Sequence, residues 1–134
     1  MATITGIGHV ELSVSDLDQS SRWYCALLGA TEVFRARNEA EHLDACAIYE
    51  PQSHTVLAFT RHDEPLADPF SPRRRGLDHF AFAVADGVEL ASWEKRLSEI
   101  GIAHNARDDG YARAITCTDP DGIPVEFYCM PPCG

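Results

Sequence analysis

The sequence lacks the features that would place the protein in a membrane, in a secretory route or on nucleic acid. Its 134 residues contain no apolar run near the roughly 20 residues that a membrane-spanning helix needs. The opening Met-Ala-Thr-Ile-Thr has neither the basic start nor the apolar stretch of a secretory signal, so we expect a cytoplasmic protein. Acidic residues outnumber basic ones by 21 to 11, and the net charge of −10 opposes binding to phosphate backbones.

No Cys-x-x-Cys pair occurs among the five cysteines, which argues against a structural zinc knuckle. An odd number of cysteines without an export signal predicts reduced thiols. Cys46 and Cys117 fall inside apolar, strand-like segments and are expected in the core, whereas Cys129 and Cys133 lie near the end of the chain.

What the sequence does contain is an internal repeat. Residues 7–16 and 77–86 follow the same pattern, and seventy positions separate His9 from His79. The same spacing separates three further pairs: Asp16 and Asp86, Trp23 and Trp93, and Leu27 and Leu97. A fixed period of this kind indicates a duplicated structural unit.

Each half of the chain predicts one strand, one helix and three further strands. Apolar residues alternate in the first strand, and a helix that ends at a glycine follows, with Trp23, Ala26 and Leu27 on the buried stripe of the first one. The expected elements are 10–14, 18–28, 31–35, 43–49 and 55–60 in the first half, and 80–84, 89–100, 103–106, 113–118 and 124–128 in the second. The pattern predicts an α+β fold of two βαβββ modules.

The domain organisation follows from the repeat. We expect one domain, 1–134, with module one at 5–60, module two at 77–130, and a linker at 61–76 that is rich in proline and charge. One module is too small to bury both faces of its sheet. The two modules are therefore expected to form a cupped mixed sheet with the helices on its outer face, by pairing within the chain or across a dimer.

Strand parity singles out three residues. His9 and His79 each alternate with the apolar residues of a first strand, so their side chains point away from the helix. Glu126 lies between Val125 and Phe127, two apolar residues whose side chains are expected to face the core. The side chain of Glu126 should therefore point to the same face as the two histidines. Two imidazoles and one carboxylate on the hollow side of the sheet are a plausible ligand set for iron(II), manganese, nickel, cobalt or zinc, with positions left open for substrate.

Other side chains are expected on the same hollow side. Glu11, two residues after His9, is a candidate catalytic base or additional ligand. Tyr128 follows Glu126 by two and is a candidate substrate contact, with packing as the alternative. Tyr111 and Arg113 come after a polar loop that would either close over a ligand or form plain surface.

The motifs around these residues resemble those of the vicinal oxygen chelate superfamily, which includes glyoxalases, extradiol dioxygenases, fosfomycin-resistance thiol transferases and bleomycin-binding proteins. The most specific of them are residues 8–14 around His9, 23–29, 78–82 around His79, and 119–126. The resemblance implies a metal-dependent enzyme that acts on a small substrate through neighbouring oxygens, with a homodimer as the usual assembly. The alternative is a binder that sequesters a drug or metabolite without turnover.

The resemblance leaves the reaction open. Glyoxalase-like members add a fourth ligand from the last strand of module one, but here that position falls on Ala58 or Leu57, depending on the alignment of the halves. The ligand set of two histidines and one carboxylate resembles instead the dioxygenases and the fosfomycin enzymes. Ring-cleaving dioxygenases usually carry a His and a Tyr upstream of the carboxylate ligand, and the corresponding stretch here has Arg107 and Thr116 instead. Dioxygenase, isomerase or lyase, and thiol transferase chemistry remain as alternatives.

Overall fold

The computed structural model of the protein describes residues 1–131 and 133. The chain divides into two compact units, Met1–Ala67 and Asp68–Gly134, and each is described by itself. The boundary between the units falls inside the predicted linker. Among the described residues, no helix combines the length and the apolar character needed to cross a lipid bilayer.

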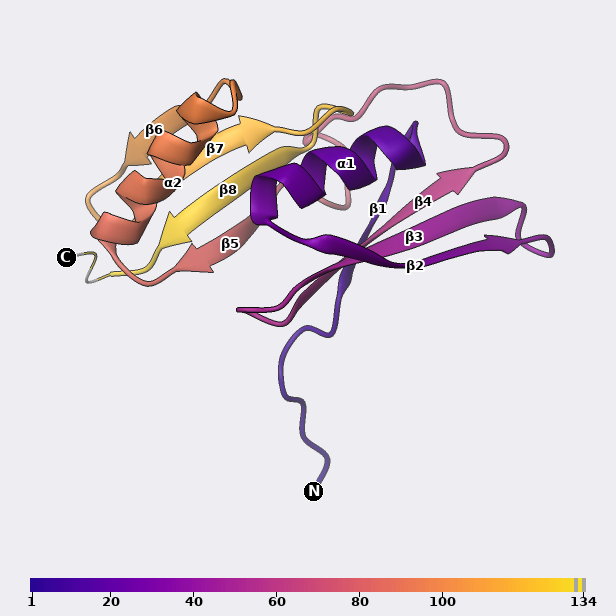
Figure 1. Cartoon of the computed structure of the whole chain (residues 1–134), viewed down its shortest axis with the longest axis horizontal. Helices are drawn as coiled ribbons and strands as arrows, with labels where there is room; N and C mark the ends of the chain where they lie inside the picture. Colours follow the sequence, from indigo (N-terminus) through magenta and orange to yellow (C-terminus); the bar gives the residue numbers. More distant parts are fainter. Residues whose placement is uncertain (132, 134) are drawn as a thin grey trace. The chain divides into compact units, whose positions relative to one another are not determined.

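The first unit is a four-stranded mixed sheet with one helix on it (Figure 1). Its strands lie in the order β1, β4, β3, β2, with β1 parallel to β4 and the other pairs antiparallel. The elements are β1 (Val10–Ser13), α1 (Leu17–Leu28), β2 (Thr31–Asn38), β3 (Leu43–Glu50) and β4 (Thr55–His62).

The second unit repeats this architecture. The strands follow the order β5, β8, β7, β6, again with one parallel pair, β5 with β8. Its elements are β5 (Phe80–Val84), α2 (Gly87–Glu99), β6 (Asn105–Asp108), β7 (Arg113–Thr118) and β8 (Pro124–Cys129). The two predicted βαβββ modules are therefore confirmed, and each carries its own sheet.

The helix ends explain why both modules begin alike. Asp16 and Asp86 are the N-cap residues, and their carboxylates accept hydrogen bonds from the backbone N–H groups of Gln19 and Glu89 at 3.0 and 2.9 Å. Such caps satisfy backbone donors that the first turn leaves without partners. At the other end, Gly29 and Gly101 have φ angles of 70° and 76°, the left-handed conformation predicted for both.

Each helix packs its aromatic stripe on the sheet below it. In the second unit, the ring of Trp93 stacks on Phe127 with centroids 4.1 Å apart, and the ring of Phe82, the partner of Phe127 in the β5–β8 ladder, has its centroid 5.7 Å from that of Phe127. In the first unit, Tyr24 takes this place against Phe59, with centroids 5.1 Å apart. These contacts define the helix-covered face of each sheet, and side chains of opposite parity point to the other face, called here the open face.

The structure corrects the expectation of reduced cysteines at one place. Cys129, at the end of β8, forms a disulfide with Cys133 across Cα atoms 5.8 Å apart. Cys46 and Cys117 remain thiols and are buried in the core as predicted. Burial raises the pKa of both thiols to about 11, so they stay protonated at neutral pH.

Candidate metal centre

Glu126 is a buried carboxylate on the open face of the second unit. Its neighbours Val125 and Phe127 are fully buried against α2, so the alternation of β8 turns Glu126 to the opposite face. Only 5% of the residue is exposed. A carboxylate this well buried needs compensating partners, because desolvation of its charge is costly.

The two oxygens of Glu126 have different partners. Thr116, directly opposite on β7, donates a hydrogen bond from Oγ1 to Oε2 at 3.1 Å. The other oxygen, Oε1, lies 3.6 Å from Nε2 of His79 and 3.6 Å from Nη2 of Arg107. The hydroxyl therefore fixes one side of the carboxylate, while the other side faces an imidazole and a guanidinium.

His79 is held so that its Nε2 faces this carboxylate. Its Nδ1 lies 2.7 Å from Oδ1 of Asp78, and a carboxylate accepts hydrogen bonds, so Nδ1 carries the proton. In a neutral ring of this tautomer, Nε2 is the nitrogen that carries the lone pair. An imidazole that donates its other N–H to a carboxylate is the usual outer-shell arrangement of metal-bound histidine.

The first unit places His9 just before the corresponding strand, β1, and Glu11 within it. His9 is exposed and immediately precedes β1, while Glu11 lies within β1 and accepts a hydrogen bond at Oε2 from Oγ1 of Thr60 at 2.6 Å. Leu12, the next residue along β1, is buried in the core, so the alternation of the strand turns Glu11 to the open face of its sheet.

The strand register settles which residue of the first unit corresponds to Glu126. In the parallel pair β5–β8, Ala81 lies opposite Glu126; in the parallel pair β1–β4, Glu11 lies opposite Ala58. Ala58, not Leu57, is therefore the counterpart of Glu126, and the first unit has no carboxylate at that position.

Neither unit gathers a complete metal site from its own described side chains. No group of three His, Cys, Asp or Glu residues stands close enough to hold an ion within either one. The second unit supplies a pair, His79 and buried Glu126, whose facing atoms, Nε2 and Oε1, fit a divalent cation. His9, in the first unit, remains a predicted third ligand.

The expected substrate contacts divide between two faces. Tyr128 is half-buried and shares the open face with Glu126, two residues before it on β8. Arg113 lies on the helix-covered face, because it has the parity of Ile115, which pairs with Phe127. Arg113 therefore does not share the face that carries Glu126 and Tyr128.

Tyr111 belongs to the turn between β6 and β7. It is 70% exposed, and its backbone N–H donates to Oδ1 of Asp109 at 3.0 Å. Two backbone hydrogen bonds, from Ala112 and then Tyr111, lower the pKa of Asp109. The turn is therefore ordered by its own aspartate, and Tyr111 projects from it into solvent within its unit.

Two residues of the site were undervalued by sequence reasoning. From the sequence, Arg107 and Thr116 were named only because they occupy positions where dioxygenases carry His and Tyr. In the structure, both side chains contact Glu126. Asp78, which orients His79, went unnoticed as a functional group. Its position directly before the histidine is a signal that the sequence does carry.

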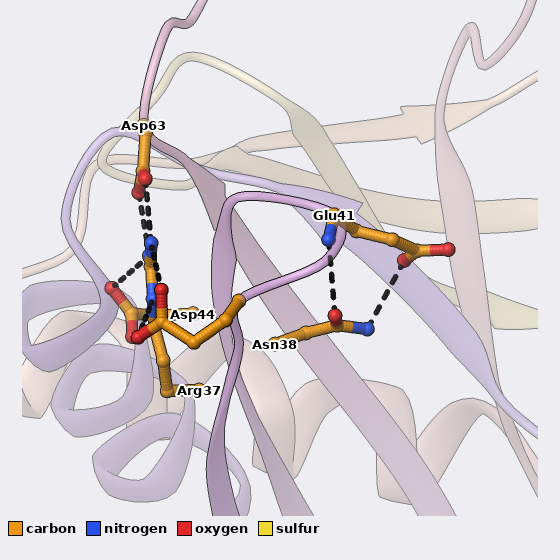
Figure 2. Close-up of polar contacts among 6 residues, drawn as sticks. Arg37, Asn38, Glu41, Asp44 and Asp63 are labelled. Atoms are coloured by element: carbon orange, nitrogen blue, oxygen red, sulfur yellow. Dashed lines mark hydrogen bonds and ion pairs between the residues drawn. The ribbon is translucent and has the colours of Figure 1, made fainter.

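A separate cluster of charge lies at the end of the β2–β3 hairpin (Figure 2). Arg37 donates to both oxygens of Asp63 at 2.6 and 2.7 Å, and its guanidinium also pairs with Glu39 and Asp44. These contacts join β2 to the residue after β4. Hydrogen bonds from Arg37 lower the pKa of Asp63.

This cluster predicts a pH-dependent contribution to stability. A carboxyl whose pKa is lower in the folded than in the unfolded chain stabilises the fold above the unfolded value, about 4, and loses this contribution as the pH falls through the folded value. Arg37→Gln should therefore lower the urea midpoint at pH 7, and the difference from wild type should shrink below about pH 4. The loss should be small and weakened by salt, because the groups are exposed.

Arg73→Gln is the matched control, since the described residues show no ion pair for Arg73 and its loss should leave the midpoint unchanged at both pH values. An Arg37→Gln difference that is the same at pH 7 and pH 3 would contradict the assignment to Asp63.

Comparison with known proteins identifies the family. Residues 6–127 match the model of the Glyoxalase/Bleomycin resistance protein/Dioxygenase superfamily. The chain belongs to this superfamily, which is the resemblance that its motifs predicted.

Individual relatives agree with this assignment. The chain is 30% identical over 129 residues to catechol-2,3-dioxygenase of Bacillus subtilis, covering 96% of this chain but only 42% of that protein. It is 28% identical to the metallothiol transferase FosB of Bacillus licheniformis, over 93% of this chain and 75% of that one. A solved glyoxylase/bleomycin resistance protein/dioxygenase domain from Frankia sp. EAN1pec superposes with a TM-score of 0.85 at 28% identity, covering 98% and 96% of the two chains.

Proposed function

We propose that this protein is a metal-dependent enzyme that binds one divalent cation through His9, His79 and Glu126 and acts on a small substrate with neighbouring oxygen atoms. The observation that carries the proposal is the pair on the open face of the second unit: Nε2 of His79 faces Oε1 of buried Glu126, with Nδ1 already bonded to Asp78. Superfamily membership and relatives named as a dioxygenase and a metallothiol transferase support it.

The chain's own residues would prepare the site before a substrate arrives. Thr116 holds Oε2 of Glu126, so that Oε1 is presented in one orientation. Asp78 fixes the tautomer and the ring orientation of His79. Arg107, beside Oε1, offsets part of the negative charge that a buried carboxylate brings.

When bound, a divalent cation would supply Lewis acidity, and iron(II) would in addition allow oxygen chemistry. Two histidines and one carboxylate leave coordination positions for the two oxygens of a catechol or a similar substrate. Tyr128, on the same face as Glu126, would contact that substrate. The resemblance also predicts a homodimer, which light scattering after gel filtration measures.

The test combines metal analysis with a substrate screen. Protein purified without chelator should hold about one divalent metal per chain, and after anaerobic loading with iron(II) it should consume oxygen when given a catechol. Metal binding with no oxygen uptake would move the proposal to isomerase, lyase or thiol transferase chemistry. Persistent absence of metal would contradict it and favour a protein that binds a drug or metabolite without turnover.

A further inference from the structure

The open face of the second unit carries two neighbouring rows of side chains. Residues paired directly across strands share one face of the sheet, and both rows run across all four strands. The row of the proposed metal ligand consists of Ala81, Glu126, Thr116 and Asn105. The adjacent row consists of Ala83, Tyr128, Ala114 and Arg107. Two residues of strand, about 7 Å, separate the rows, so Tyr128 and Arg107 both lie beside the row of Glu126.

Arg107 holds Glu126 only loosely. Its Nη2 atom lies 3.6 Å from Oε1, beyond the reach of a hydrogen bond, and 55% of its side chain is exposed. Among the described residues, no second carboxylate forms an ion pair with it. Arg37 of the first unit shows the contrast, because it donates to both oxygens of Asp63 at 2.6 and 2.7 Å and pairs with two further carboxylates. The guanidinium of Arg107 therefore keeps N–H donors for another acceptor.

The local charges favour an acceptor that comes from a ligand. Oε1 is the oxygen that Glu126 would offer to the metal, and a guanidinium and a divalent cation at the same oxygen repel each other. Arg107 is thus poorly placed to be the permanent partner of Glu126. It is also the only arginine or lysine in the two rows, in a chain whose net charge of −10 disfavours anionic ligands. An anionic group that reaches this face would pair with Arg107.

We propose that Arg107 binds a carboxylate of the substrate, which makes the substrate a small aromatic acid with two neighbouring oxygens on its ring. The assignment rests on the proposed function, because those oxygens are the ones that chelate the metal. A planar guanidinium donates two parallel N–H bonds to a carboxylate. Tyr128 lies in the same row, separated from Arg107 by Ala114 alone, and supplies an aromatic surface for the ring. Arg107 then determines specificity, beyond offsetting the charge of Glu126.

The test compares two probes that differ by one charge, and it measures binding, not turnover. Both 3,4-dihydroxybenzoate and its methyl ester offer neighbouring oxygens, but only the acid carries a carboxylate. The ester group withdraws electrons more strongly than the carboxylate does, so a preference for the acid does not come from stronger chelation. In calorimetric titration of the zinc(II)-loaded wild type, we expect the acid to bind about tenfold more tightly than the ester, because it gains charge-assisted hydrogen bonds.

Three variants assign this preference to one side chain. Arg107→Gln should abolish the preference and leave the Kd for the ester nearly unchanged. Arg107→Lys keeps the charge but not the planar fork, and should retain part of the preference. Arg113→Gln is the matched control, because Arg113 lies on the neighbouring strand β7 with its side chain on the helix-covered face, and it should keep the full preference.

The remaining outcomes separate this inference from the proposed function. Equal affinities of the wild type for acid and ester, or a preference that survives Arg107→Gln, would overturn the role of Arg107 while the proposed function stands. Equal weakening of both probes by Arg107→Gln would also overturn it, since the residue would then support the metal site without recognising the carboxylate. If the wild type holds no zinc(II), or binds neither probe once loaded, the inference and the proposed function fail together.

Discussion

Replacing His79 by alanine is expected to abolish retention of the divalent metal while leaving the fold intact. Nε2 of His79 is the nitrogen that faces the buried carboxylate of Glu126, and no other histidine is near that oxygen among the described residues of this unit. The His79 side chain is 41% exposed and lies on the open face, away from the core under α2. Its removal should therefore change the free energy of unfolding by less than about 1 kcal/mol.

Metal content by mass spectrometry and thermal unfolding of the same preparation check both halves of this prediction. His104→Ala is the matched control within the unit, because His104 bonds to the carbonyl of Ile102 and stands apart from Glu126. It should keep the wild-type metal content. Wild-type metal content in His79→Ala would remove the histidine from the site.

Replacing Phe127 by alanine should have the largest effect on stability, about 3–5 kcal/mol. Phe127 is 1% exposed and contacts the rings of both Trp93 and Phe82, so truncation leaves a cavity under the helix. Since small domains are stable by only about 5–15 kcal/mol, much of the fold's margin would be lost. Urea unfolding followed by tryptophan fluorescence measures this change.

The neighbouring residue provides the contrast. Tyr128 has the opposite parity on β8 and is half-buried, so Tyr128→Ala should cost clearly less than Phe127→Ala. Equal losses at the two positions would mean that β8 does not present its alternate side chains to different faces. The placement of Glu126 on the open face depends on the same alternation.

The repeat and the strand alternation were enough to predict the fold. Corresponding aspartates and glycines mark the two helices, and their caps and φ angles confirm the reading. Boundaries were less well predicted, because strands such as β2 continue as long as a partner offers hydrogen bonds: β2 runs to Asn38, three residues beyond the expected end. Pairing, which is not local, decides where such a strand stops.

Helix α1 shows how an apolar pattern can mislead. Trp23 was expected on the buried stripe together with Ala26 and Leu27. The helix instead buries Tyr24 and Leu27, together with Ser20 and Leu17, a spacing of three and four residues. A small rotation of the helix exchanges one aromatic residue for its neighbour. The repeat therefore predicted correctly that a helix lies here, but not which aromatic residue of that helix is buried.

The site was predictable to the extent that it depends on parity. Alternation along β8 placed Glu126 opposite to Phe127, as the structure has it. Along β7, Arg113 has the same parity as Ile115 and Cys117, which are buried. The same rule would therefore have predicted Arg113 on the helix-covered face. Arg107 could not be assigned, since its approach to Glu126 depends on how β6 pairs with β7. The disulfide between Cys129 and Cys133 was not predicted either, because the sequence alone does not show which cysteines lie close enough to pair.

Anomalous X-ray diffraction from crystals grown with zinc tests the central claim most directly, because it locates the ion and every residue that binds it. The account predicts one peak per chain, about 2.1 Å from Nε2 of His79 and a carboxylate oxygen of Glu126, with an imidazole nitrogen of His9 in the same shell. A peak remote from Glu126, or a metal bound there with His9 elsewhere, would contradict it.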